Sequence, residues 1–446
     1  MKFLFSLFVL FEISAAVHAQ KAFTYRQCVK YALEHNLGLQ NNRFDADKQN
    51  INLQAARLSF LPRINASTSY EINRGKTVNA ATNTYVESNL FSNDWALVGS
   101  MLIFDGFRQT NRVAFEQFNL NVTNLQYEQA KNELIYGVLE AYTTHLLNVG
   151  LITIQQQQYD LSKKECDKVD KMVEMGRLPG SDRYEVQARL ANDEYLLLRY
   201  RNATQQSEYT LRKLMNFPVD SAIQFADLSK EPIISALVSD DSLFRIAADK
   251  LPQIKILNNQ YHAARKSLQM ERGSLTPKLR LYGGWYSGYY QSVVDANGKV
   301  VGFSDQIDRN HKLNYGLALD IPILGALSRQ NNVRMSKISY KQAQNRLEAG
   351  MQALQYEVRQ ARQDRDAAVK EYQSALKKEE SEKVAFESSQ KKHEKGLMNI
   401  MDYYESKNNL ARAGSEVLRT RMQMYVKEIC LNFYKTGSMI DWQVTN

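Results

Sequence analysis

Residues 347–361 read LEAGMQALQYEVRQA, and the apolar side chains in this stretch recur at intervals of four, three, four and three. Such spacing places one apolar stripe along an α-helix. The stretch belongs to a run without proline over 326–396, and a run of similar length without proline covers 107–176. Each run would make about 100 Å of helix, which needs partners along its whole extent, as in a coiled coil.

Each long run is followed by a second helical stretch, so the sequence predicts two helical hairpins. One covers 107–215 with its tip at 176–182, and the other covers 326–435 with its tip at 396–402. The tip turns are predicted at two glycines, Gly176 and Gly396. Apolar side chains of the last stretch recur every seven residues at Leu410, Val417, Met424 and Leu431. Alanine, glutamine and tyrosine dilute these seams, which favours a helical wall with one wet side over a tight two-stranded zipper.

The chain repeats itself once. A helix exit at Leu61-Pro62 lies 215 positions before a similar exit at Thr276-Pro277. Further along, an offset of 220 positions relates Gly176, Asp182, Glu185 and Leu190 to Gly396, Asp402, Glu405 and Leu410. A constant offset over so many positions predicts a tandem duplication, with one half at 20–230 and the other at 231–446.

Each half also carries two β-like segments, the first of which follows a helix-ending proline. The four segments are 64–73, 94–104, 279–291 and 312–323, and polar loops over 74–93 and 292–311 join each pair. Apolar and polar residues alternate along them, as on a sheet with two different faces. Runs of about 10 to 12 residues match a tilted strand that crosses a bilayer, and their tyrosine and tryptophan are typical of the headgroup level. A soluble four-stranded sheet is the alternative explanation.

The N-terminus predicts secretion. Lys2 precedes a short apolar run, and Val17-His18-Ala19 offers small residues to signal peptidase, so we expect 1–19 to be a cleaved signal peptide. No cysteine follows the cut, which argues against an acylated N-terminal anchor. After this segment no stretch reaches the ~18 apolar residues of a transmembrane helix. Contact with a membrane would then be made by a β-barrel or at the surface.

Composition excludes other classes of function. The mean hydropathy of −0.47, with 44% hydrophobic and 24% charged residues, is that of a water-exposed folded protein. The net charge of +9 arises from 57 basic residues interleaved with 48 acidic ones. This pattern predicts solvated helix faces and no nucleic-acid partner. Cys28, Cys166 and Cys430 stand apart without metal-ligand spacing, and we interpret them as buried small hydrophobes.

The sequence predicts no catalytic, cofactor-binding or metal site. It lacks a nucleophile elbow, a glycine-rich phosphate loop and a His/Cys or His/Glu metal cluster. Its six histidines show no ligand spacing. We therefore expect neither enzymatic activity nor a cofactor.

The sharpest acidic pattern lies at the predicted hairpin tips. The returning helices start with Asp182-Arg-Tyr-Glu185 and Asp402-Tyr-Tyr-Glu405. One interpretation is a capping box, in which the aspartate accepts backbone N–H bonds and the glutamate reaches back. The other is functional, because Asp402 and Glu405 around a threefold pore would form carboxylate rings that favour cations. The two interpretations are compatible.

With these features in order, the chain resembles the TolC family of outer-membrane efflux proteins over nearly all of its length after residue 19. Each motif is only a turn or cap signal by itself, so the resemblance rests on their order, spacing and duplication. The motifs are the helix start Cys28-Val29-Lys30-Tyr31-Ala32-Leu33, the exit Leu61-Pro62, the segments Leu102-Ile103-Phe104-Asp105-Gly106 and Ile321-Pro322-Ile323-Leu324-Gly325, and the two glycine-to-acid tips.

The resemblance implies a mostly α-helical fold with a membrane β-barrel. Each protomer of a homotrimer would give four strands to a shared twelve-stranded barrel, continued by a long antiparallel coiled-coil helical tunnel in the periplasm. Residues 220–250 and 436–446 would form a belt around the helices. The implied location is the outer membrane of a Gram-negative-type bacterium, in contact with outer-membrane lipid.

The resemblance also implies a function. The chain would be the passive exit duct of a tripartite efflux or type I secretion system, closed at its periplasmic tips. A periplasmic adaptor and an inner-membrane pump of the RND, ABC or MFS class would open it. The rival interpretation is a periplasmic coiled-coil adaptor or structural protein without a barrel, against which the aromatic strands and the duplication argue.

The family's gate can be carried over residue by residue. Its constricting acidic pair at the second tip falls on Asp402 and Glu405, and its acid at the first tip falls on Asp182, beside Glu185. These positions would form the periplasmic gate, with the second tip as the cation-selective ring.

The chain departs from the family pattern around this gate. Met398 and His393 stand where the best-known member of the family has an arginine and a tyrosine, and Pro179-Gly180 gives the first tip a stiffer and different shape. We therefore expect a different closing network. We hypothesise that His393 makes closure pH-dependent, whereas its simpler interpretation is an exposed helix residue.

Overall fold

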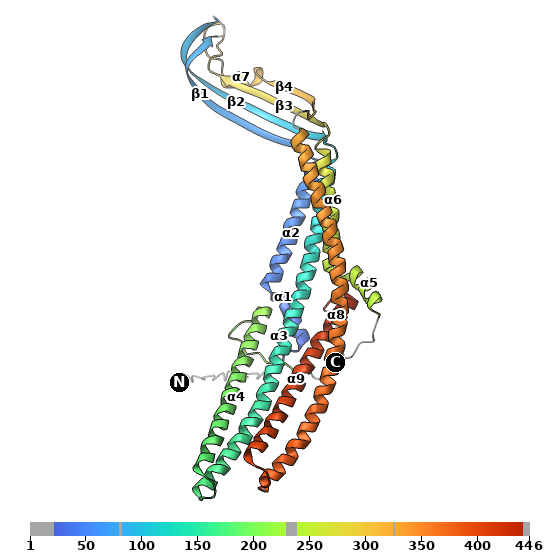
Figure 1. The fold of residues 1–446 in the computed structure, drawn as a ribbon. Helices are drawn as coiled ribbons and strands as arrows, with labels where there is room; N and C mark the ends of the chain where they lie inside the picture. The colour runs from blue at the N-terminus through green and yellow to red at the C-terminus, as the bar shows by residue number, and fades with distance from the viewer. Residues whose placement is uncertain (1–21, 80–82, 229–238, 324–325, 440–446) are drawn as a thin grey trace, which may run out of the picture. The chain divides into compact units, whose positions relative to one another are not determined.

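The structure is a computed structural model that describes residues 22–79, 83–228, 239–323 and 326–439 (Figure 1). The predicted signal peptide and the belt residues 229–238 and 440–446 lie outside these ranges. Within them, no helix combines the length and the apolar character needed to span a membrane.

The chain folds into two compact units, each built from both sequence halves. The hairpin unit comprises the residues up to Asn41, Gln129–Leu251 and the residues from Leu354 onward. The sheet unit comprises Asn42–Glu128 and Pro252–Ala353. The predicted boundary near residue 230 therefore separates the two repeats of the sequence and does not separate the compact units.

Helices dominate both units, and their lengths follow the predicted runs. The elements are α1 (Tyr25–His35), α2 (Leu37–Leu58), β1 (Arg63–Asn79), β2 (Thr84–Phe104), α3 (Arg108–Glu174), α4 (Gly180–Met215), α5 (Asp240–Lys250), α6 (Pro252–Gly273), β3 (Lys278–Tyr290), α7 (Phe303–Arg309), β4 (Lys312–Asp320), α8 (Ala326–Glu394) and α9 (Ile400–Thr436).

The four strands form one antiparallel sheet in the order β1-β2-β3-β4 (Figure 1). The predicted polar loop 74–93 is mostly strand, because β1 and β2 continue their pairing to Asn79 and Thr84. The second predicted loop, 292–311, contains the short helix α7. Polar composition predicts a loop in both places, but in the first the backbone pairing between β1 and β2 continues through the polar residues.

The sheet has two chemically different faces. Ala66, Leu97, Trp285 and Leu313 are register partners and so share one face. We call it the apolar face; its exposed side chains include Ile64, Ile72, Leu97, Met101, Leu281, Leu313, Leu317 and Leu319. The opposite, polar face carries Arg63, Asn65, Ser67, Ser69, Glu71, Asp94, Ser100 and Arg280. A water-exposed sheet normally hides its apolar side, so this one needs a covering surface.

In the hairpin unit the core is divided along the helices. One cluster gathers Cys28, Leu139, Tyr142, Leu211 and Tyr425 from α1, α3, α4 and α9. A second cluster near the tips joins both hairpins through Cys166, Val169, Val186, Phe386, Tyr403 and Tyr404. Of the three cysteines, Cys28 and Cys166 are buried, Cys430 is half-buried, and all three are free thiols.

A tight glycine crossing fixes the start of α3 in the sheet unit. Asp105 caps the helix, since its carboxylate accepts the N–H groups of Arg108 (2.9 Å) and Gln109 (3.0 Å). Gly106 has φ +70°, and a Cβ at this position would lie 2.1 Å from Thr276 Oγ1 and 2.6 Å from the carbonyl oxygen of Gly273. The chain can turn here because Gly106 and Gly273, which have no side chains, let their two backbone segments approach closely. Gly325, the predicted counterpart in the second half, lies outside the described residues.

We predict that Gly106→Ala lowers the free energy of unfolding by about 2–5 kcal/mol, from the left-handed backbone and the steric clash together. The control is Gly298→Ala, because Gly298 has φ +78° and open space around its Cβ position. The control should lose about 1–2 kcal/mol, the backbone cost alone. Guanidinium unfolding followed by circular dichroism measures both, and equal losses would contradict the crossing.

Candidate functional site

The two hairpin tips share one backbone design. Gly176 and Gly396 have φ of +69° and +73°, and nothing lies within 4 Å of either Cβ position. After α3, Arg177 N–H donates to Met172 O (2.8 Å). After α8, Leu397 N–H donates to Lys392 O (2.9 Å). A hydrogen bond from an N–H group to the carbonyl oxygen five residues earlier, next to a glycine in the left-handed conformation, defines the Schellman motif at a helix C-terminus. The tips therefore have the same turn on both sides of the duplication.

The returning helix of the second tip is capped by Asn399. Its Oδ1 accepts the N–H of Asp402 (2.8 Å), and its Nδ2 donates to Asp402 Oδ2 (2.8 Å). Asp402 is thus a first-turn residue, where a carboxylate is favoured by the helix dipole. The interpretation of Asp402-x-x-Glu405 as a capping box is wrong, because the short turn starts α9 at Ile400. Asp402 and Glu405 are both exposed.

The first tip differs in its polar chemistry. Pro179 occupies the cap position and makes no side-chain cap bond. Asp182 is half-buried, and its N–H donates to Pro179 O (3.2 Å). Glu185 pairs with Arg189 (2.9 Å) instead of reaching back to the helix start. The capping-box interpretation is therefore wrong here too.

His393 joins the two hairpins near their tips. Its Nε2 lies 2.9 Å from Glu165 Oε1 of α3, and since a carboxylate only accepts, this nitrogen carries the proton. The ring stacks on Tyr403 with centroids 4.5 Å apart and an interplanar angle of 16°. Lys168 Nζ lies 3.6 Å from the same carboxylate oxygen. The interpretation of His393 as an exposed helix residue is wrong, and pH-dependent closure stays a prediction.

Tyr403 is itself buried beneath this contact. Burial raises the pKa of its hydroxyl to about 12, and the negative charges of Glu165 and Glu394 act in the same direction. The phenol is therefore neutral under ordinary conditions, and the tip contact is an uncharged ring against a histidine–carboxylate pair.

A buried polar cluster links the hairpins further from the tips. Lys407 of α9 is 1% exposed, and its Nζ donates to Asp193 Oδ2 of α4 (2.8 Å) and to Ser162 Oγ of α3 (2.6 Å). Ser162 donates to the same aspartate oxygen (2.6 Å), and Gln155 Nε2 donates to Asp193 Oδ1 (3.3 Å). Burial lowers the pKa of Lys407, although the neighbouring Asp193 opposes the shift. We call these residues the Lys407 cluster.

A polar groove of about 660 Å³ runs beside the Lys407 cluster. Residues of α3, α4 and α9 line it, and Lys378 of α8 reaches it. Its charged members are Asp193, Lys378, Arg412, Glu416 and Arg419. Across the described ranges, no group of histidine, cysteine, aspartate and glutamate is arranged to hold a metal ion.

The sequence patterns did not single out the Lys407 cluster or Glu165. A signal was present, because Lys407 lies three residues before Leu410 and four after Tyr403, at a position where the apolar seam of α9 calls for a hydrophobic residue. Asp193 interrupts the seam of α4 in the same way between Leu190 and Leu197. Two charges of opposite sign in facing seams indicate a buried pair.

We predict that Lys407→Met lowers the free energy of unfolding by about 3–5 kcal/mol, because it leaves the buried Asp193 carboxylate uncompensated. Asp193→Leu should cost a similar amount. The double variant Lys407→Met/Asp193→Leu should cost clearly less than the sum of the two, since both charges leave together. Guanidinium unfolding of the four proteins tests this cycle, and additive losses would contradict the pairing.

The family model described as outer membrane efflux protein matches residues 28–216 and again 245–434. Comparison with curated protein sequences gives no match.

Solved channels share the fold at low sequence identity. The CmeC outer membrane channel of Campylobacter jejuni is 18% identical, with a TM-score of 0.79 over 94% of this chain and 87% of that one. CusC is 15% identical, with a TM-score of 0.79 over 94% and 93%. The open state of the Neisseria gonorrhoeae MtrE outer membrane channel is 15% identical, with a TM-score of 0.74 over 95% and 91%. Since the family model covers both repeats, the chain belongs to the outer membrane efflux protein family.

Proposed function

We propose that the chain is one protomer of a homotrimeric exit duct, a passive conduit of a tripartite efflux or type I secretion system. Its strands would cross the outer membrane, and its hairpins would form a periplasmic tunnel closed at the tips. The observation that carries the proposal is the sheet, which exposes an apolar face on one side and a polar face on the other.

The dimensions of the apolar face support a lipid-facing band. No charged residue lies on this face of β2 from Phe91 to Met101, or of β3 from Leu279 to Tyr289. Ten residues of strand extend about 33 Å, which a tilt near 40° reduces to the ~25 Å of a barrel's apolar band. Beyond this span, Arg74 and Lys76 stand on the same face of β1.

A row of aromatic side chains marks one border of the band. The ring centroids are 4.3 Å apart between Tyr70 and Phe91, 5.5 Å between Phe91 and Tyr289, and 5.6 Å between Tyr289 and Phe303. Aromatic rings gather where hydrocarbon meets headgroups. We call these four residues the aromatic row and assign it to that border.

The sheet edges support assembly. Within the described strands, β1 and β4 each pair on one side only. A lipid-facing sheet cannot leave backbone groups unpaired, so closure into a barrel is required. Three copies would give a twelve-stranded barrel whose polar face lines a water-filled lumen.

The tips supply the proposed gate. Asp402 and Glu405 are exposed on the first turns of α9, and threefold assembly would bring three copies of each around the axis. Asp182 and Glu185 form a secondary acidic position at the first tip. The sum of these charges would favour cations at the mouth of the pore.

Opening requires partners, since nothing in the duct supplies energy. We assign this role to a periplasmic adaptor and an inner-membrane pump of the RND, ABC or MFS class. The polar groove beside the Lys407 cluster is the surface we assign to the adaptor, because it lies between the two hairpins that would have to move.

Planar-bilayer recordings of the detergent-purified protein test the proposal. A small, cation-selective conductance from a trimer is the expected result. A water-soluble monomer without conductance would favour the rival adaptor without a barrel.

We predict that Ala66→Arg destabilises the vesicle-inserted protein by about 2–4 kcal/mol more than Ser67→Arg. Both residues are exposed neighbours on β1, but Ala66 lies on the apolar face and Ser67 on the polar face. Reversible unfolding from lipid vesicles measures the difference. Equal costs would show that the apolar face does not meet hydrocarbon.

We also predict that Asp402→Asn/Glu405→Gln lowers the cation-to-anion permeability ratio by roughly two-fold or more, because it removes the rings of charge. The control, Asp220→Asn/Asp241→Asn, removes the same charge from exposed positions outside the tips. Reversal potentials in asymmetric salt report the ratio. An unchanged ratio in the tip variant would refute the ring.

A further inference from the structure

The helices of the sheet unit lie in the same order as its strands. Along the chain α2 leads into β1, β2 into α3, α6 into β3 and β4 into α8. Side-chain hydrogen bonds join consecutive helices, and they are Gln49–Glu116 between α2 and α3 (2.7 Å), Asn121–Asn259 between α3 and α6 (3.3 Å), and Tyr261–Tyr340 between α6 and α8 (2.7 Å). The order is therefore α2-α3-α6-α8, and α2 and α8 are the edge helices just as β1 and β4 are the edge strands.

The edge helix α2 carries apolar side chains on two opposite sides. Leu53 is buried within the unit, at 2% exposed. At about 100° per residue, Leu53 points roughly 200° away from Ile51. On that other side Phe44, Ile51 and Leu58 follow one another every seven residues, and they are 56%, 62% and 61% exposed. We call these three residues the α2 stripe; Leu37, 59% exposed, continues the same spacing.

The period of the α2 stripe selects the kind of surface that covers it. A straight helix drifts by about 20° for every seven residues, so a strict seven-residue repeat does not stay on one side of a straight helix. It does stay in contact with a second helix when the two coil around each other. We therefore expect a helix to cover the α2 stripe.

The other edge helix, α8, has the same arrangement. Ser336 and Ala343 are buried, at 8% and 3% exposed. Leu327 and Ile338 are 74% and 58% exposed and lie about three turns apart, on one side of the helix. Ser336 points roughly 180° away from Leu327. We call Leu327 and Ile338 the α8 stripe, and each edge helix thus has one apolar side covered within the chain and one left open.

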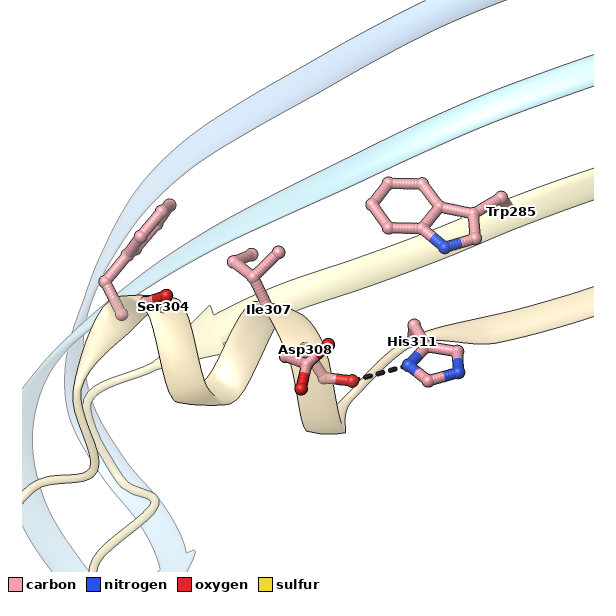
Figure 2. A pocket seen from close by; sticks show the side chains of 6 residues that line it. Trp285, Ser304, Ile307, Asp308 and His311 are labelled. Atoms are coloured by element: carbon pink, nitrogen blue, oxygen red, sulfur yellow. Dashed lines mark hydrogen bonds between the residues drawn. The ribbon is translucent and has the colours of Figure 1, made fainter.

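The free strand edge on the α8 side is short. Among the described strands β4 pairs only with β3. Beyond Lys312 the helix α7 takes the place of a strand, because Gln306 accepts the N–H of Tyr290 (2.9 Å) and donates to its carbonyl oxygen (3.1 Å). Figure 2 shows His311 at the end of α7, directly before β4. The free edge is therefore Lys312–Asp320, the segment that leads into α8.

A second copy that paired its β4 with β1 would bring its α8 beside α2. α2 ends at Leu58, just before β1 begins at Arg63, and α8 begins at Ala326, just after β4 ends at Asp320. Since the two strands would pair antiparallel, the two helices would also run antiparallel, with Leu58 and Leu327 both close to the sheet. One neighbour would then cover the free strand edge and the apolar stripe together, whereas a foreign helix on the stripe would leave the strand edge unpaired.

We propose that the α2 stripe of one copy packs against the α8 stripe of a second copy as an antiparallel coiled coil. We call this contact the seam. The inference rests on the proposed function, because it takes the sheet edges to close into a shared barrel, and it names the helices that seal the tunnel wall between copies. In a ring of three copies the same seam occurs three times.

Cysteine cross-linking tests the seam. In Leu58→Cys/Leu327→Cys, oxidation should give covalent dimers and trimers about five-fold or more in excess of those in the control Leu58→Cys/Ser328→Cys, because a disulfide needs facing Cβ atoms. Ser328 is the exposed neighbour of Leu327 and points about 100° away from it. Within one chain α3 and α6 separate α2 from α8, so a link joins two copies.

Further variants complete this experiment. The pair Ile51→Cys/Ile338→Cys covers a register about one helical turn away. The single variants Leu58→Cys and Leu327→Cys report any link through the native thiols, of which Cys28 and Cys166 are buried. Non-reducing electrophoresis of the denatured protein measures the covalent species.

A charged substitution gives a readout that does not depend on the exact register. Ile51→Asp should lower the fraction of trimer about ten-fold or more, because each of the three seams would bury an unpaired carboxylate. The single chain should stay folded, since Ile51 is exposed in it. The control Asn52→Asp adds the same charge at the exposed neighbouring position and should leave the trimer intact. Sedimentation in detergent measures the trimer, and circular dichroism measures the helix content.

Two results would overturn the seam and leave the duct in place. One is a conducting trimer in which neither stripe pair is cross-linked more than the Ser328 control. The other is Ile51→Asp trimer as abundant as Asn52→Asp trimer, which would assign the α2 stripe to a partner of different sequence. A monomer without conductance from the unaltered chain would instead remove the proposed function and the seam with it.

Discussion

The structure depends on the need to cover the sides of very long helices. α3 has 67 residues and α8 has 69, more side-chain surface than one compact core can bury. The hairpin unit meets the need with successive small clusters, one around Tyr142, one around Tyr372 and one at Tyr403 near the tips. Each cluster is local, so the polar residues between clusters decide how neighbouring helices are aligned.

Buried charges serve that alignment. The Lys407 cluster joins α9 to α3 and α4, and a second pair, Arg365 and Glu428 (2.8 Å), joins α8 to α9. Such pairs add little to the free energy of unfolding compared with well-packed apolar residues. A shift of one helix along its neighbour would, however, separate the two charges and leave each of them unpaired in the interior. We interpret them as fixing the register of helices whose apolar seams are too dilute to do so. Hairpins held in this way would move together more readily than apart.

Much of this architecture is predictable because its signals are local. Proline-free runs with apolar spacing predicted the long helices, and alternation predicted the two faces of the strands. The extension of β1 and β2 into 74–93 cannot be predicted in this way, since pairing between strands stabilises polar residues such as Asn89 and Ser92, which favour loops by themselves. At the tips, the acids were found, but Asn399 as the cap and Glu165 as the partner of His393 were missed. Asn399 is the cap because the turn after α8 is short and α9 begins directly after it. Glu165 lies 228 residues away from His393 in the chain, so no local pattern predicts their contact.

The duplication shows which parts of the fold are free to diverge. Both tips have a glycine in the left-handed conformation and the same Schellman hydrogen bond, so the backbone of the turn is the same in the two repeats. Their acids differ, because Asp182 is half-buried while Asp402 and Glu405 are exposed. The strands differ more: the first pair has 17 and 21 residues, and the second has 13 and 9. In the second pair α7 satisfies the backbone that the shorter β4 leaves unpaired, through Gln306 at Tyr290 and Asn310 at Gly288. A repeat that needs only its turns and its helix lengths to be kept can therefore change the charges at its tips and the pairing at the edge of its sheet.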